Sequence, residues 1–309
     1  MTENKSRTHQ AQKNEDYLSK ALCLNGQVRI YAVRTTRVAE ECRKRHDLWP
    51  VASAALGRTL SVGTMMGAML KGQEKLTIQV QGGGPLGQVV VDANADGEVR
   101  GFVGNPHVHF PLNEHGKLDV GRAVGTSGNI YVTKHLGVGE PYRGSSPIVN
   151  GEIGEDFTYY FAQSEQTPSA VGVGVLVNPD NTVKASGGYI LQLMPEVEDE
   201  VITDLESHLH QLPPVSKMVD EGYTPENIIE AIFPGEHIRW LGKTPVTFSC
   251  SCSVDRVRQT LISLGKEEIE SIIQQEGKAQ VECHFCHERY ELGRDELKEL
   301  VAEINGNHR

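Results

Sequence analysis

Four of the six cysteines in this 309-residue chain lie in one C-terminal stretch. They are Cys250, Cys252, Cys283 and Cys286. One residue separates the first pair, two separate the second pair, and thirty residues (253–282) lie between the pairs. Zinc takes four ligands in a tetrahedron and thiolates suit it, and clustered cysteines in a reducing compartment are more often metal ligands than disulfides. The spacing therefore predicts one bound zinc ion.

The same residues leave other interpretations open. His284 and His287 are alternative ligands, although four cysteines already complete the shell. Spacing alone favours a purely structural zinc module. Acidic surroundings argue against a nucleic-acid-binding zinc ribbon, and Cys283 and Cys286 lack the βαβ context of a thioredoxin-like motif. However, oxidants attack thiolates, and disulfide formation would remove the zinc ligands and unfold the domain.

The composition is that of a soluble globular protein, with 38% hydrophobic and 23% charged residues. The net charge of −11 disfavours binding to nucleic acid or to an anionic membrane surface. No apolar run reaches the ~18 residues that a membrane span needs. The polar residues 1–15 lack the apolar region of a signal peptide. We therefore expect a cytosolic protein with a disordered extension over residues 1–15.

Short β-branched or aromatic segments, separated by Gly, Asn and Asp, predict a strand-rich domain over residues 16–194. Two helices are predicted early, at 37–45 and 51–70. The predicted strands are 27–33, 76–80, 88–91, 99–103, 157–161, 171–177 and 189–193. Because strands and helices do not alternate regularly, we expect an α+β fold with a mixed α/β-sheet domain rather than a doubly wound parallel sheet.

The composition becomes acidic after residue 194. Apolar residues recur every four positions from Val197 to Leu209, which predicts an amphipathic helix ending before Pro213. Thr224 and Pro225 are typical of the start of another helix. We interpret residues 195–242 as a helical linker of marginal stability that docks on the first domain.

Residues 243–309 form the predicted C-terminal zinc-binding domain. A strand leads into Cys250, a helix begins after Ser253, and a hairpin over 280–290 carries the CHFC segment at its tip. Two further helices complete the prediction. Domains this small often need a metal ion or disulfides to remain folded.

From Asp16 onward the chain resembles the heat shock protein 33 family, the redox-regulated holdase chaperones of bacteria. The resemblance is carried by segments such as DYLSKAL, QVRIYAVRTT, PVASAALGRTL, LTIQVQGGGPLG, FSCSCS and VECHFCHERY. It implies a zinc-bound, reduced and inactive monomer. It also implies an oxidised, zinc-free form, often dimeric, that protects unfolding proteins from aggregation without ATP. The disulfides that it implies for that form are Cys250–Cys252 and Cys283–Cys286.

Two motifs resemble ligand sites but favour simpler interpretations. Gly82, Gly84 and Gly87 match a dinucleotide-binding pattern, yet a strand rather than a helix is expected to follow, so a glycine-rich loop is favoured. Residues 92–97 match the opening of a calcium loop. The final glutamate of such a loop is missing, because Val103 occupies its position, and a hairpin turn is favoured.

Met65, Met66 and Met69 could form an adaptable surface for unfolded client proteins, although methionines at helical spacing are more often core residues. Cys23 and Cys42 are expected to be buried. The sequence contains no recognisable catalytic constellation, so we expect a protein that is not an enzyme.

Three hypotheses follow. The first is a redox-switched holdase whose client surface, on the N-terminal domain, is exposed when the linker melts. The second is a constitutive protein-binding module with a purely structural zinc site. The third is an enzyme that uses the GGGPLG loop. Zinc ejection by peroxide or hypochlorite separates the first two hypotheses, and a nucleotide titration tests the third.

Overall fold

The computed structural model describes residues 15–137, 139–195 and 197–306. The predicted N-terminal extension therefore lies, except for Glu15, outside the described residues. The chain divides into two compact units, Met1–Ser249 and Cys250–Arg309. Each unit has its own hydrophobic core.

The first unit contains a five-stranded antiparallel sheet with the order β10-β1-β2-β9-β8. Its strands are β1 (Tyr17–Cys23), β2 (Val28–Arg34), β8 (Ser169–Val177), β9 (Val183–Leu193) and β10 (Arg239–Pro245). Side chains alternate between the two faces of the sheet. Along β2, Ile30 and Ala32 belong to one apolar cluster, whereas Tyr31 and Val33 belong to another. Both faces of this sheet are therefore covered.

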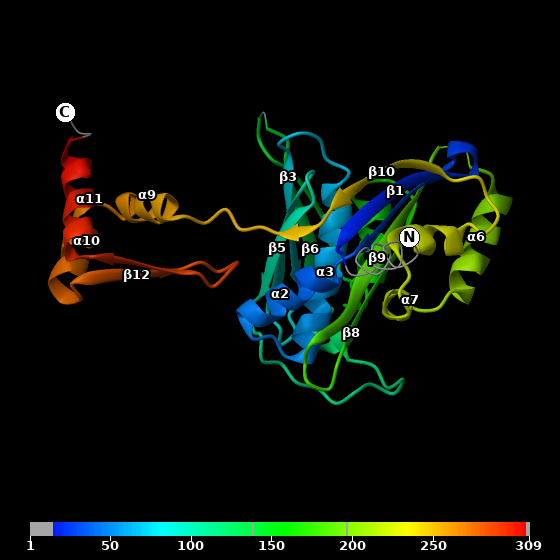
Figure 1. Ribbon diagram of the computed structural model, residues 1–309, viewed down its shortest axis with the longest axis horizontal. Coiled ribbons are helices and arrows are strands. Elements are labelled where there is room, and N and C mark those ends of the chain that lie inside the picture. Colours follow the sequence, from blue (N-terminus) through cyan, green and yellow to red (C-terminus); the bar gives the residue numbers. More distant parts are fainter. Residues whose placement is uncertain (1–14, 138, 196, 307–309) are drawn as a thin grey trace, which may run out of the picture. The chain divides into compact units, whose positions relative to one another are not determined.

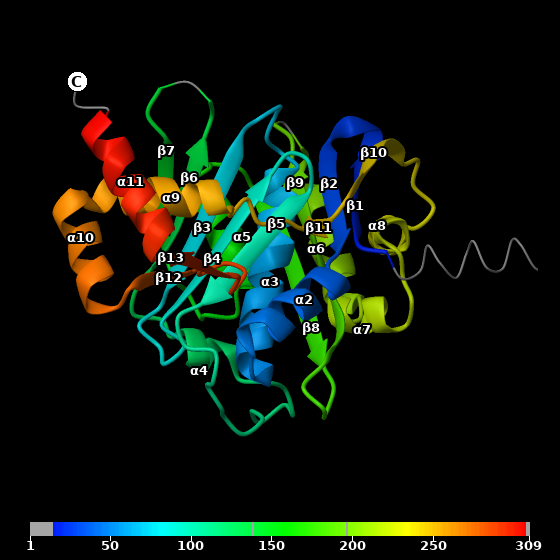
Figure 2. The same cartoon turned by 60° about the vertical axis from the view of Figure 1, so that its left-hand side comes forward.

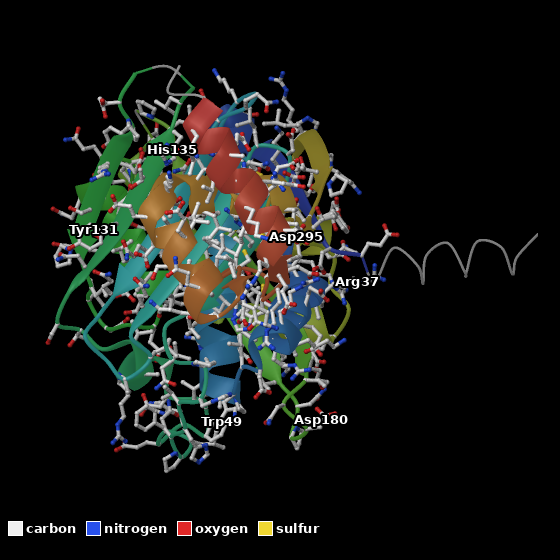
Figure 3. The ribbon with its side chains drawn as sticks, turned by 90° about the vertical axis from the view of Figure 1, so that its left-hand side faces the viewer. Arg37, Trp49, Tyr131, His135, Asp180 and Asp295 are labelled. Carbon is white, nitrogen blue, oxygen red and sulfur yellow. The ribbon has the colours of Figure 1, made fainter. Side chains whose placement is uncertain are left out.

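A second sheet has six strands in the order β11-β5-β4-β3-β6-β7. The strands are β3 (Lys75–Gln81), β4 (Gln88–Asn94), β5 (Glu98–Val103), β6 (Asn129–His135), β7 (Tyr142–Pro147) and β11 (Thr247–Phe248). Only the β11–β5 pair is parallel. Along β6, Ile130 and Val132 are fully buried, whereas Tyr131 is 40% exposed on the outer face (Figure 3). One face of this sheet is thus apolar and the other polar.

Strands β10 and β11 connect the linker region to the cysteines. The sequence pattern predicts that residues 243–249 belong with the cysteine domain. In the structure these residues belong to the first unit, because β10 pairs with β1 and β11 pairs with β5. Neither strand is rich in β-branched residues, and their assignment rests on these partner strands.

Helix α3 (Pro50–Gly67) lies between the two sheets (Figure 1). Nearly all of its residues are buried, so it is covered on every side. Pro50 occupies its first turn, where the missing N–H costs nothing. Although α3 is long and apolar, no helix among the described residues could cross a membrane.

Small residues allow the sheets to approach α3 closely. A Cβ atom on Gly57 would lie 2.8 Å from Val175 Cγ2, in the five-stranded sheet. A Cβ atom on Gly63 would lie 2.7 Å from Val91 Cγ1, in the six-stranded sheet. The two glycines therefore set the spacing on opposite sides of the helix.

Three further helices of the first unit are α2 (Thr36–His46), α4 (Val120–Val124) and α5 (Gly154–Gln163). The last of these corrects the strand predicted for residues 157–161. Phe157 and Phe161 are four residues apart, which puts them on one face of a helix, and both are buried. Asp156 accepts hydrogen bonds from four backbone N–H groups of residues 149–153, all of which precede the helix. Aromatic content suggested a strand, but the spacing and the cap produce a helix.

The linker region folds into α6 (Asp199–Gln211), α7 (Val215–Asp220) and α8 (Pro225–Ile232). Helices α7 and α8 pack on the five-stranded sheet, on the face opposite α3 (Figure 2). Ile228 and Ile229 of α8 are fully buried there. The buried residue of α6 is Leu205. The linker is therefore docked chiefly through α7 and α8.

A polar contact also fixes α8. Thr224 and Asn227 form a reciprocal capping box at its start. Glu226, in the first turn, accepts a hydrogen bond of 2.6 Å from the Tyr17 hydroxyl of β1. The same carboxylate lies 2.7 Å from Lys243 Nζ of β10. One carboxylate thus joins the linker to two strands of the sheet.

The second unit consists of α9 (Val254–Leu264), α10 (Lys266–Gln275), the hairpin β12 (Lys278–Glu282) and β13 (Arg289–Gly293), and α11 (Arg294–Gly306). Its core comprises seven buried apolar residues drawn from these elements. The predicted hairpin and helices of this region are present. Such a core is small for an independently folded unit.

Overpacking beside α3 provides a test of the fold. Replacing Gly63 by valine places a branched side chain against Val91, and we expect the free energy of unfolding to fall by about 1–3 kcal/mol. Urea denaturation of the full chain measures this change. The exposed Lys71→Ala variant is the control and should stay within about 0.5 kcal/mol of the parent. Equal stability of the Gly63→Val variant and the parent would contradict the close packing.

Candidate metal centre

The four C-terminal cysteines converge in the second unit. All four Sγ atoms lie within 4.8 Å of one another. Cys250 Sγ is 3.7 Å from Cys283 Sγ, and Cys252 Sγ is 3.2 Å from Cys286 Sγ. A zinc ion with Zn–S bonds of about 2.3 Å would separate its sulfur ligands by about 3.8 Å. The sulfur positions are thus close to those of a tetrahedral tetrathiolate site.

The hairpin between β12 and β13 positions the second cysteine pair. Cys283 N donates to Glu288 O at 3.0 Å, and His287 N donates to Cys283 O at 2.8 Å. His287 has a φ of 56°, in the left-handed region, which lets the chain turn back sharply. The turn brings both sulfurs of the CHFC segment into the cluster of four.

The first pair lies on an extended segment before α9. In an extended chain, alternate side chains point the same way, so Cys250 and Cys252 share one side and Ser251 takes the other. Arg256 of α9 donates to Ser251 Oγ at 2.6 Å. Ser253 caps α9 by accepting from Arg256 N. These two contacts anchor the cysteine segment to the start of the helix.

Hydrogen-bond donors surround the sulfurs. Burial raises the pKa of the Cys283 thiol, which backbone N–H groups of Phe285 and Cys286 lower in part. Burial likewise raises the pKa of Cys286, against a backbone N–H group of Glu288. The Tyr290 hydroxyl donates to Cys252 Sγ at 3.1 Å. Four thiolates this close together repel one another, and a divalent cation would offset that charge.

The donor set fits zinc. Four thiolates in a closed tetrahedral shell are typical of structural zinc sites. Within the described part of the chain, the one metal-binding group identified contains these four cysteines and neither His284 nor His287. His287 Nδ1 instead lies 3.6 Å from Glu282 Oε1. The cysteines would hold the ion without the alternative histidine ligands.

The residue types and spacing of the sequence do not reveal Tyr290 as a neighbour of the cysteines. The available signal was its position on the returning strand, four residues after Cys286. The direction of its side chain depends on the hairpin register, in which Tyr290 pairs with Val281. The sequence alone does not fix that register.

The glycine-rich motif at residues 82–87 forms a packed loop between β3 and β4. The backbone N–H groups of Gly84 and Leu86 donate to carbonyl groups of residues 124 and 123, respectively. A Cβ atom on Gly82 would lie 2.2 Å from Gly125 O, so glycine serves close backbone packing. Strand β4 follows at Gln88, and no helix N-terminus is available here for a phosphate.

The calcium-like motif forms the turn of the β4–β5 hairpin. Asp92 pairs with Arg100 at 2.8 Å and accepts a hydrogen bond from Thr77. Asn94 Oδ1 accepts from the backbone N–H groups of Asp96 and Glu98. Both side chains are engaged in holding the hairpin, as the predicted turn requires.

Met65 and Met66 are buried in the core around α3, and Met69 packs against it. Client binding through these methionines remains a prediction that would require this core to open. Cys23 and Cys42 are fully buried, as predicted. Burial raises the pKa of each of these thiols to about 12, so they carry little of the thiolate form that oxidants attack.

Comparison with known proteins gives consistent results. A family model described as "Hsp33 protein" matches residues 16–293. A protein of Geobacillus kaustophilus named 33 kDa chaperonin is 57% identical over 92% of this chain and 97% of its own length. A 33 kDa chaperonin of Brevibacillus brevis is 57% identical over 94% of this chain and 99% of its own. The crystal structure of the Thermotoga maritima 33 kDa chaperonin (heat shock protein 33 homolog) superimposes with a TM-score of 0.88 and 35% identity. That superposition covers 95% of this chain and all of the other.

Removing one sulfur tests the metal centre. We expect the Cys286→Ser variant to bind zinc at least tenfold more weakly than the parent, because one of four thiolates is lost. The helical circular dichroism signal of α9 to α11 should also fall, because the small core of this unit needs the bound ion to stay folded. Chelator competition measures the affinity. The Cys42→Ala variant, altered in the first unit, should bind one zinc ion with the parent affinity; full zinc binding by Cys286→Ser would exclude the four-cysteine site.

Proposed function

The chain belongs to the Hsp33 family, and from that premise we propose that it is a redox-regulated, ATP-independent holdase chaperone. Family membership makes it an Hsp33-type chaperone. The finer proposal is that the reduced, zinc-bound protein is inactive and that oxidation activates it. The observation that carries this proposal is the convergence of four sulfurs in a unit with a small core.

Thiolate oxidation would supply the switch. A bound zinc ion would hold all four sulfurs as thiolates. Oxidation to the disulfides Cys250–Cys252 and Cys283–Cys286 would remove every ligand, and each bond would close only a tiny loop. Short loops restrict the unfolded chain little, so these disulfides would replace only part of the roughly 10 kcal/mol or more that structural zinc contributes. The second unit would then unfold.

Linker undocking would provide the client surface. The outer face of the five-stranded sheet carries Ile30, Ala32 and Leu191, which α7 and α8 cover. Loss of these helices would expose a contiguous apolar face, and surfaces of that kind bind unfolded polypeptides. We propose that clients bind this face.

We further propose that the reduced protein is a monomer and that the activated chaperone is a homodimer. The protein would act in the cytoplasm. No catalytic role is proposed.

The switch is tested by following zinc release together with suppression of aggregation of a heat-unfolded test protein. We expect peroxide with mild warming to release one zinc ion per chain and to raise holding activity, and reductant plus zinc to reverse both. Peptide mapping should find the two local disulfides. If zinc stays bound, or leaves with no gain in holding, the cysteine site is structural and the alternative of a constitutive binding module stands.

Linker docking is tested by a pair of substitutions on α8. Ile229→Asn removes a fully buried apolar side chain, and a loss of about 2–5 kcal/mol of docking energy is expected from comparable core truncations. Limited proteolysis should then cut residues 197–232 more rapidly, and holding activity should appear without oxidant. The Glu230→Gln variant changes the exposed face of the same helix and should remain inactive. An undocked but inactive Ile229→Asn protein would refute masking by the linker.

A further inference from the structure

Tyr290 makes a contact that distinguishes one of the four sulfurs. Its hydroxyl donates to Cys252 Sγ at 3.1 Å from strand β13. The side chain is half-buried and packs against the core of the second unit. Hairpin pairing with Val281 holds the backbone of Tyr290 in place. The hairpin pairing and the packing of the ring thus fix the position of the hydroxyl relative to the Cys252 sulfur.

The sulfurs of the hairpin receive donors of another kind. Cys283 accepts from backbone N–H groups of Phe285 and Cys286, and Cys286 accepts from that of Glu288. Those donors belong to the turn itself and are set by its backbone. Cys252 lies on the extended segment before α9, outside that turn, and a side-chain hydroxyl donates to its sulfur. Donors to thiolate ligands are known to tune metal affinity and redox behaviour.

We propose that Tyr290 is a positioning residue of the four-cysteine centre: its hydrogen bond orients and stabilises the Cys252 thiolate and thereby slows oxidation of that sulfur. The inference rests on the proposed redox function. A hydrogen bond withdraws electron density from the sulfur, which weakens it as a nucleophile. Loss of the hydroxyl should therefore lower metal affinity and raise sensitivity to oxidant together.

The oxidation step can be written with hydrogen peroxide as the oxidant. The Cys252 thiolate attacks one peroxide oxygen, the O–O bond breaks, and hydroxide leaves as a sulfenic acid forms. A neighbouring thiolate then attacks the sulfenic sulfur, forming the S–S bond and releasing a second hydroxide. Two thiolates together lose two electrons to one peroxide, and the metal ion keeps its charge. Tyr290 acts on the first attack, because its hydroxyl contacts the attacking sulfur.

The test compares full-length Tyr290→Phe, which keeps the ring and removes the hydroxyl, with Tyr142→Phe. Tyr142 is exposed on β7 of the first unit and lies outside the metal centre. For each variant we would measure zinc affinity by chelator competition and the rate of zinc release in excess peroxide. The thiolate-to-cobalt charge-transfer band of the Co(II)-substituted protein reports on sulfur electron density. Circular dichroism confirms that each variant is folded.

For Tyr290→Phe we expect the zinc affinity to be about tenfold weaker than that of the parent. Zinc release in peroxide should be roughly threefold faster or more. The charge-transfer band of the Co(II)-substituted protein should lie at longer wavelength. Tyr142→Phe should match the parent in all three measurements. A folded Tyr290→Phe protein with parental affinity, rate and spectrum would overturn the inference while leaving the proposed function intact. A parent that keeps its zinc in peroxide would overturn both the proposed function and the slowing of oxidation by Tyr290, although affinity and spectrum would still report on thiolate positioning.

Discussion

The C-terminal unit has to join an extended segment to a hairpin with little apolar packing to help it. Seven buried apolar residues form its core, and they come from the helices and strands that surround the cysteines. The Cys250 segment and the Cys283 turn meet through their sulfurs. Because the apolar core of the unit is small, contacts that hold these sulfurs together add to the stability of the unit. This constraint connects the chemistry of four side chains to the folding of a whole unit, and the proposed switch depends on it.

The first unit is held in a different way. Helix α3 is buried between two sheets, and glycines allow close approach on both sides. Its two cysteines are buried with strongly raised pKa values, so oxidants have little thiolate to attack there. The linker is intermediate in the amount of apolar surface that it buries. Helix α8 buries several isoleucines, whereas α6 buries chiefly Leu205. The two thiols of the first unit are thus fully buried, whereas Cys250, Cys252 and Cys283 are partly exposed, as the proposed redox switch requires.

The sequence predicted the features that depend on local pattern. Cysteine spacing predicted the cluster of four sulfurs, Thr224 and Pro225 marked the start of α8, and short β-branched or aromatic segments located β2 to β5. Features that depend on distant partners were missed or misassigned. Strand β10 is largely exposed and pairs with a strand more than two hundred residues earlier. Residues 157–161 have strand-like composition but helical spacing. Tyr290 could not be placed beside Cys252 without the hairpin register.

The chain passes from one sheet to the other between Pro245 and Thr247, immediately before the cysteines. The covalent junction between the two units, Ser249–Cys250, follows shortly after β11. A disturbance of the second unit would reach the two-residue strand β11 first. It would then reach the seven-residue strand β10, and only after that the docked helix α8. The number of paired residues in each strand therefore increases inward. A weak disturbance would separate only β11 from β5. A stronger one would also separate β10 from β1 and would then reach the linker helices.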